Sequence, residues 1–99
     1  MSERTARGGL ATRYAVVSTL TFNDRSTAEG ELSEILSRVS RMSGFIEGCW
    51  VALGADKGIS VIAFDSQAAA QAFATFAGGA PYASVTPEAI EVGEVLARA

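Results

Sequence analysis

Hydrophobic and polar positions first alternate and then change to a helical period. Residues 14–22 are rich in β-branched and aromatic side chains, and their even-numbered positions form the more apolar face, a pattern typical of a strand. Ser26 followed by Glu29 makes a capping box, which predicts the start of a helix. The residues of one apolar helical stripe follow: Leu32, Ile35, Leu36, Val39 and Met42. Gly44 is expected to end this helix.

Two further apolar runs follow, over residues 45–53 and 59–64. The loop between them, residues 54–58, is short and bounded by glycines, so the two runs are expected to form a hairpin. Strand alternation places one set of apolar side chains of the first run on one face: Phe45, Cys49, Val51 and Leu53. Ile46 and Trp50 are expected on the opposite face.

The last part of the chain predicts a second helix and a fourth strand. Ser66 can cap a helix that runs to about Ala77 and is stopped by two glycines. Its expected inner stripe is Ala69, Ala72, Phe73 and Phe76. Residues 80–88 carry both prolines and are expected to form a loop, and residues 89–97 to form the final strand.

This order of elements predicts an α+β, ferredoxin-like βαββαβ fold. Right-handed crossovers place both helices on one face of a four-stranded antiparallel sheet. We expect a single domain over residues 13–99, preceded by a flexible tail over residues 1–12. The other sheet face would carry apolar side chains of the two central runs, so a second copy is expected to cover it, giving a homodimeric α/β barrel.

Composition narrows the possible roles. The chain has 99 residues, a net charge of −3 and basic residues that are scattered, which disfavours nucleic-acid binding. No apolar run is long enough for a membrane span, and no segment resembles a signal peptide. With one cysteine, no internal disulfide can form, so a cytoplasmic location is expected. Histidine is absent, which removes the commonest general base and metal ligand, and no cofactor or metal is expected.

Two segments are similar to a known family. One runs Ser43-Gly44-Phe45-Ile46-Glu47-Gly48-Cys49-Trp50, and the other leads from Gly58 through Phe64-Asp65-Ser66 into the alanine-rich helix. They resemble the antibiotic-biosynthesis-monooxygenase-like proteins of the dimeric α/β-barrel superfamily, although Ser43 stands where the family pattern has proline. The resemblance covers residues 14–97 in element order. It implies a ferredoxin-like dimer; some relatives are cofactor-independent oxygenases and some degrade haem, a role that the lack of histidine disfavours here.

Trp50 is the first candidate for a binding site. It either forms the wall of a pocket for a flat aromatic ligand or packs in the dimer interface, where aromatic residues are enriched, and packing is the favoured interpretation. Cys49 alternates with Trp50 and is interpreted as a small buried apolar residue, as a lone cysteine in a strand usually is. The absence of histidine also disfavours a role as nucleophile, because no imidazole can activate the thiol.

Three polar residues are weaker candidates. Glu94 could act as a base if it pointed inward, but exposure at a strand end is favoured. Asn23 resembles a polar pocket position of some oxygenase relatives, but an ordinary turn residue is the favoured interpretation. Tyr82 could close a pocket mouth or pin its loop. The sequence therefore predicts a homodimer of unassigned role that binds a small aromatic or apolar molecule in the barrel; the alternative is a cofactor-independent, monooxygenase-like enzyme acting on an aromatic, polyketide-type substrate.

Overall fold

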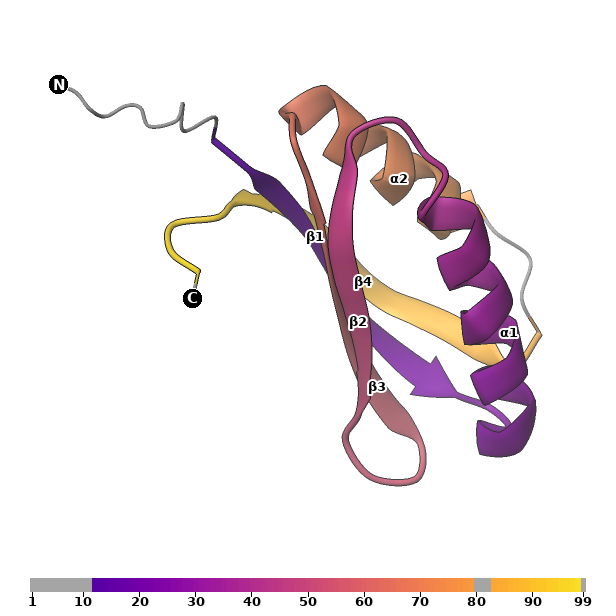
Figure 1. The fold of residues 1–99 in the computed structure, drawn as a ribbon. Coiled ribbons are helices and arrows are strands. Elements are labelled where there is room, and N and C mark those ends of the chain that lie inside the picture. The colour runs from indigo at the N-terminus through magenta and orange to yellow at the C-terminus, as the bar shows by residue number, and fades with distance from the viewer. Residues whose placement is uncertain (1–11, 80–82, 99) are drawn as a thin grey trace, which may run out of the picture.

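The computed structural model describes residues 12–79 and 83–98. The predicted tail, apart from Thr12, and Tyr82 lie outside the described residues. The elements follow the predicted order, shown in Figure 1: β1 (Tyr14–Phe22), α1 (Arg25–Val39), β2 (Phe45–Ala52), β3 (Lys57–Phe64), α2 (Gln67–Gly79) and β4 (Val85–Glu94).

The four strands form one antiparallel sheet in the order β2-β3-β1-β4. Both helices lie on the same side of it (Figure 1). This arrangement confirms the predicted ferredoxin-like α+β fold. The outer strands are β2 and β4, so the residues of these two strands have a sheet neighbour on one side only.

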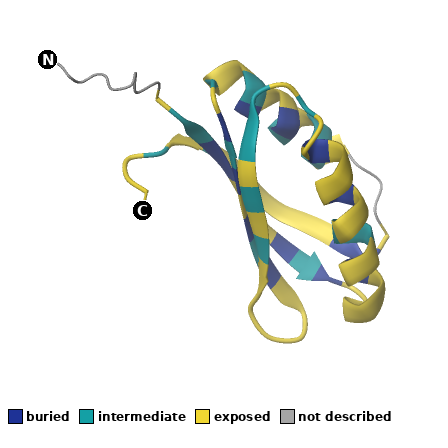
Figure 2. Cartoon of the chain, viewed as in Figure 1, coloured by how far each residue is buried: buried dark blue, intermediate teal, exposed yellow. Residues whose placement is uncertain are grey.

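Buried and exposed residues alternate along the central strands (Figure 2), so the two sides of the sheet differ in burial. We call the side under the helices the helix face and the other side the open face. On β1 the helix face carries four buried residues, Val16, Ser18, Leu20 and Phe22. On the open face Val17 of β1, Val51 of β2 and Val61 of β3 are 40%, 43% and 41% exposed. As expected, this face of the single chain exposes apolar side chains.

A β-bulge in β2 corrects one predicted side-chain direction. Phe45 is opposite Phe64 of β3, and Glu47 is opposite Ala63, so Ile46 is an extra residue in this strand. Phe45 therefore turns to the helix face, where its ring meets that of Phe64 edge-on with centroids 6.2 Å apart. Simple alternation had placed Phe45 with Cys49, because alternation alone takes no account of a bulge.

The limits of α1 also differ from the prediction. The N-cap is Asp24, not Ser26, and its carboxylate accepts hydrogen bonds from the hydroxyls of Ser26 (3.1 Å) and Thr27 (2.9 Å). The helix ends at Val39, and Gly44, with φ +84°, serves the turn that leads into β2. A Cβ at residue 44 would collide with the side chains of Asp65 and Ala69, so two constraints favour glycine there.

The fourth strand begins at Val85 rather than at residue 89, and it includes Pro87. A proline is tolerated here because β4 is an edge strand and Pro87 adjoins a bulge, in which Glu88 is the extra residue between Ala89 and Pro87. The side chain of Glu88 accepts a hydrogen bond from the hydroxyl of Thr21 at 2.8 Å. The prediction was wrong because it treated both prolines as loop residues.

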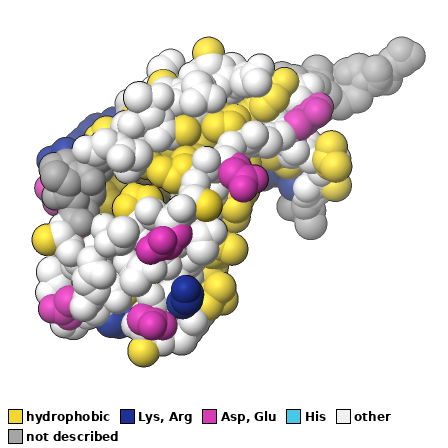
Figure 3. Space-filling view, turned by 180° about the vertical axis from the view of Figure 1, so that it is seen from behind, with side chains coloured by type: hydrophobic (Ala, Val, Ile, Leu, Met, Phe, Trp, Pro, Cys, Tyr) yellow, Lys and Arg dark blue, Asp and Glu magenta, His cyan; other side chains and the backbone are white. Residues whose placement is uncertain are grey.

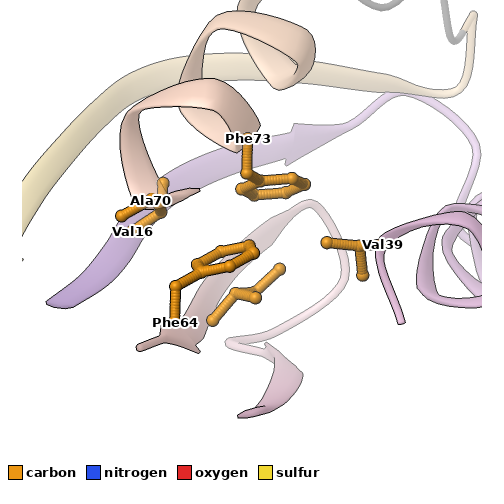
Figure 4. Packing of buried hydrophobic residues seen from close by; sticks show 6 residues of the cluster. Val16, Val39, Phe64, Ala70 and Phe73 are labelled. Carbon is orange, nitrogen blue, oxygen red and sulfur yellow. The ribbon is translucent and has the colours of Figure 1, made fainter. Parts of the chain in front are cut away.

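The core fills the space between the helix face and the helices. One cluster, drawn in Figure 4, consists of Val16, Val39, Ile62, Phe64, Ala70 and Phe73. A second cluster, nearer the start of α1, consists of Leu20, Phe22, Ala28 and Val85. Ser66 caps α2 through the backbone N–H of Ala69 at 3.1 Å, as predicted, whereas Ala72 is exposed rather than part of the inner stripe.

Candidate functional site

A small cavity lies between the sheet and the helices, with a volume of about 40 Å³. Its floor comes from all four strands and its roof from both helices. The lining residues are Ser18, Leu20, Leu32, Ile35, Trp50, Ser60, Phe73, Phe76, Ala77, Val85, Pro87 and Ile90. In the view from behind, apolar side chains gather in the hollowed middle of the molecule (Figure 3). Among the described residues, the lining of this cavity is therefore apolar apart from two hydroxyls and the indole N–H of Trp50.

Those two hydroxyls belong to a row of residues that crosses the whole sheet. Trp50 of β2 is opposite Ser60 of β3, Ser60 is opposite Ser18 of β1, and Ser18 is opposite Ile90 of β4. All four line the cavity. A tryptophan, two adjacent hydroxyls and an isoleucine thus form one continuous strip of floor.

The chemistry of this strip suits recognition of a flat molecule with one polar end. Ser18 and Ser60 are 3% and 2% exposed, so their hydroxyls lie away from bulk water. A hydroxyl can both donate and accept a hydrogen bond. The rings of Phe73 and Phe76, 6.1 Å apart, supply an aromatic wall from α2. Small-molecule sites are usually lined by apolar groups together with a small number of polar groups.

Trp50 faces the helices and not the open face. It is half-buried and packs against both core clusters. This orientation directs Trp50 away from the face that was expected to meet a second copy; its side chain both packs on the core clusters and lines the cavity. Cys49 points to the opposite side of β2, as predicted, but it is exposed on the open face rather than buried.

The other candidates lie apart from the cavity. Asn23 is exposed, and its side-chain amide donates to the backbone carbonyl of Ala83 and the hydroxyl of Thr86, both at 3.0 Å. These hydrogen bonds connect the turn after β1 to the start of β4. Glu94 is exposed near the end of β4, opposite Tyr14. Neither residue lines the cavity, so the described structure does not bring the candidates together around Trp50.

Sequence reasoning missed Ser18 and Ser60. The signal was present, because each serine interrupts an otherwise apolar face of its strand: Ser18 stands between Val16 and Leu20, and Ser60 precedes Ile62. What the sequence lacked was the register. Only the pairing of β1 with β3 places the two interruptions side by side.

The open face has a hollow of its own, of about 310 Å³. Residues 95–98, which follow β4, cross this face, and Arg98 forms an ion pair with Glu47 of β2 at 2.9 Å. Arg13, just before β1, contributes a buried Nη1 atom that has no hydrogen-bond partner within the described residues. An apolar face thus carries one cationic group whose hydrogen-bonding capacity is incompletely used.

Comparisons with known proteins agree with this fold. No family model matches the sequence, and no curated protein matches it. Among solved structures, the NE2512 protein of unknown function from Nitrosomonas europaea is similar, with a TM-score of 0.68, 23% identity, and coverage of 90% of this chain and 94% of that one. The cofactor-independent oxygenase SnoaB from Streptomyces nogalater is similar with a TM-score of 0.65, 16% identity, and coverage of 90% and 96%.

This chain has the ferredoxin-like fold of these proteins. The haem-degrading protein Rv3592 from Mycobacterium tuberculosis shares it as well, with a TM-score of 0.53, 17% identity, and coverage of 87% and 96%. The resemblance to the antibiotic-biosynthesis-monooxygenase-like proteins is thereby confirmed as one of fold. Within residues 12–79 and 83–98, no helix has the length and apolar character that crossing a bilayer requires.

Proposed function

We propose that this protein binds a small aromatic or apolar molecule between its helices and its sheet. The observation that carries the proposal is the strip Trp50–Ser60–Ser18–Ile90, which offers an aromatic surface and two buried hydroxyls under an apolar roof. A ring system can stack on the indole and the Phe73 ring, while a carbonyl or hydroxyl oxygen of the ligand reaches the two serines.

Fluorescence tests this proposal directly, because Trp50 is the only tryptophan. Titration with naphthols, quinones and uncharged naphthalene derivatives should quench the Trp50 emission saturably. The double variant Ser18→Ala, Ser60→Ala should weaken the binding of naphthol more than that of naphthalene, since only naphthol can form the hydrogen bond. If none of these molecules quenches Trp50 saturably, the binding proposal is wrong.

A cofactor-independent, monooxygenase-like activity on an aromatic, polyketide-type substrate is the second candidate. The fold that the chain shares with SnoaB supports it. The lining of the cavity argues for binding rather than reaction, because among the described residues it contains no Asp, Glu, Lys, Arg, Cys or Tyr side chain to move a proton. Oxygen uptake in the presence of a ligand that quenches Trp50 would favour the enzyme; binding without oxygen uptake would favour a binding protein.

We further propose that the active form is a homodimer joined through the open faces. Val17 and Val61 lie opposite each other on the two central strands of that face, Val51 lies near the end of the edge strand β2, and covering these exposed valines removes apolar surface from water. The same face carries charged groups of both signs. Arg13 and Arg98 are positively charged, and Glu88 and Glu91 are negatively charged. A twofold interface places one patch against its own copy, so a mixture of signs is what such a patch needs.

A further inference from the structure

A groove of about 220 Å³ lies on the other side of Trp50 from the cavity. It runs between α1 and the end of β2, and its lining residues are Phe22, Arg25, Ala28, Glu29, Leu32, Trp50, Val51 and Ala52. Trp50 and Leu32 line both spaces. The groove and the cavity are therefore neighbours that share two side chains as walls.

The size of the cavity makes this neighbour important. A volume of about 40 Å³ is far below the roughly 300 Å³ at which ligand pockets begin. A molecule with two rings can enter only if the wall moves. Joined to the groove, the cavity approaches the size that such a ligand needs.

The position of Trp50 allows that movement. It stands on an edge strand, so no further strand of the described sheet confines it on the outer side. Its neighbours on the same face of β2 are small, Gly48 on one side and Ala52 on the other. Gly48 lies close against Ile62, which fills that side, whereas Ala52 lines the groove. Rotation of the indole towards Ala52 is the open direction.

Arg25 lies in the groove and is held in place by its surroundings. Its Nη1 donates to the carbonyl of Gly54 at 3.1 Å, its Nε lies 3.4 Å from a carboxylate oxygen of Glu29, and its guanidinium sits 5.9 Å from the centre of the Phe22 ring. The side chain is 46% exposed. One hydrogen bond and one ion pair leave the guanidinium with further N–H donors for a ligand oxygen.

We propose that ligands enter through this groove, that Trp50 is a movable partition between groove and cavity, and that Arg25 selects ligands that carry an anionic oxygen beside an aromatic body. This inference rests on the proposed ligand-binding function. It adds a second subsite, 25 residues from Trp50 in sequence, at the first residue of α1. The aromatic body displaces the indole, and the anionic group remains at the mouth of the groove.

Two probes with the same rings separate the parts of this proposal. One is 8-anilinonaphthalene-1-sulfonate, and the other is N-phenyl-1-naphthylamine, which lacks the sulfonate. Both accept energy from tryptophan, so a loss of Trp50 emission reports binding near that residue. We expect saturable quenching by both probes, with tighter binding of the sulfonate.

Two variants test the groove. Arg25→Gln should weaken the binding of the sulfonate about threefold to fivefold, the size expected for an exposed charge pair, and leave that of the uncharged probe unchanged. Ala52→Phe, at an exposed position that lines the groove, should block the path of the indole and weaken both probes. The matched controls are Arg41→Gln and Ala72→Phe, which change exposed residues outside both spaces and should alter neither affinity.

The outcomes are distinct. If a naphthol quenches Trp50 in the parent protein but neither of these larger probes does, this inference fails while the binding function stands; if the naphthols fail as well, both fail. If both probes bind but Ala52→Phe changes neither affinity, the bound ligand does not displace the indole towards Ala52 and the partition is wrong, while the binding function stands. If Arg25→Gln changes both affinities equally, Arg25 does not select the anion. Cooperative melting of each variant confirms that the probe reports a folded protein rather than exposed core.

Discussion

Ser84 donates both its backbone N–H and its hydroxyl to the same carboxylate oxygen of Glu31. The two residues are 53 positions apart, one on α1 and the other just before β4. Ser84 is 3% exposed, so its polar groups depend on this partner rather than on water. The pair ties a helix to the first residues of an edge strand, beside the cavity residues Leu32 and Val85.

Replacing Glu31 should therefore destabilise the protein. Glu31→Ala leaves the buried N–H and hydroxyl of Ser84 unpaired, which costs about 1–3 kcal/mol. The control Glu34→Ala removes an exposed ion pair to Arg38, at 3.4 Å, and should cost less than about 1 kcal/mol. Urea denaturation measures both. Equal losses for the two variants would show that Ser84 has another partner.

Trp50→Ala should cost less stability than truncation of a fully buried ring. Phe64 is 0% exposed at the centre of the core, and Phe64→Ala should cost about 3–5 kcal/mol. Trp50 is half-buried and borders two spaces, so its ring makes fewer contacts with protein atoms than the ring of Phe64. Truncation of Trp50 therefore removes fewer packing contacts. Thermal melting compares the two variants. A Trp50→Ala protein that melts as low as Phe64→Ala would make Trp50 a packing residue.

The proposed dimer should dissociate when a charge enters the middle of the open face. Sedimentation of the parent protein at micromolar concentration should give about twice 10.3 kDa. Val61→Glu should give the monomer mass, because two copies of the carboxylate would face an apolar surface. Leu36→Glu, at a residue 38% exposed on α1, is the matched control and should remain a dimer. A monomeric parent protein would refute the dimer at once.

The cap of α1 predicts a defined acid dependence. Hydrogen bonds from the Thr27 side chain first, then from the Thr27 backbone and the Ser26 side chain, lower the pKa of Asp24 from its usual 3.8. Because the folded pKa is the lower one, the stabilisation is complete above the unfolded value and is lost as the pH falls through the folded value. Asp24→Asn keeps a good cap without the charge. Denaturation curves between pH 7 and pH 2 should show the two proteins converging only at the acidic end.

Most of the architecture could be predicted from the sequence, because it depends on the periodicity of apolar residues and on the capping and turn residues between the elements. The strand periods, the serine cap of α2 and the glycine-bounded hairpin predicted six elements in the right order. The errors have several causes, and the one in the direction of Phe45 comes from a bulge. The bulges at Ile46 and Glu88 insert a residue without changing the local composition, so no period reveals them.

The site was less predictable than the fold. Trp50 was recognisable as a large aromatic residue in a strand, but which layer it faced depended on the sheet order and on the positions of the helices. The serines of the floor are separated by 42 positions in sequence and meet only through register. Residues that converge through long-range pairing leave no local pattern.

The bulge at Ile46 also bears on how this chain can be compared with its relatives. If Ile46 were absent, Phe45, Gly48 and Trp50 would still point to the same side of the sheet. Ile46 is an extra residue that stands outside the alternation of β2, so its removal turns no other side chain to the opposite face. A relative that lacks Ile46 would therefore keep the side chains of β2 on the same faces.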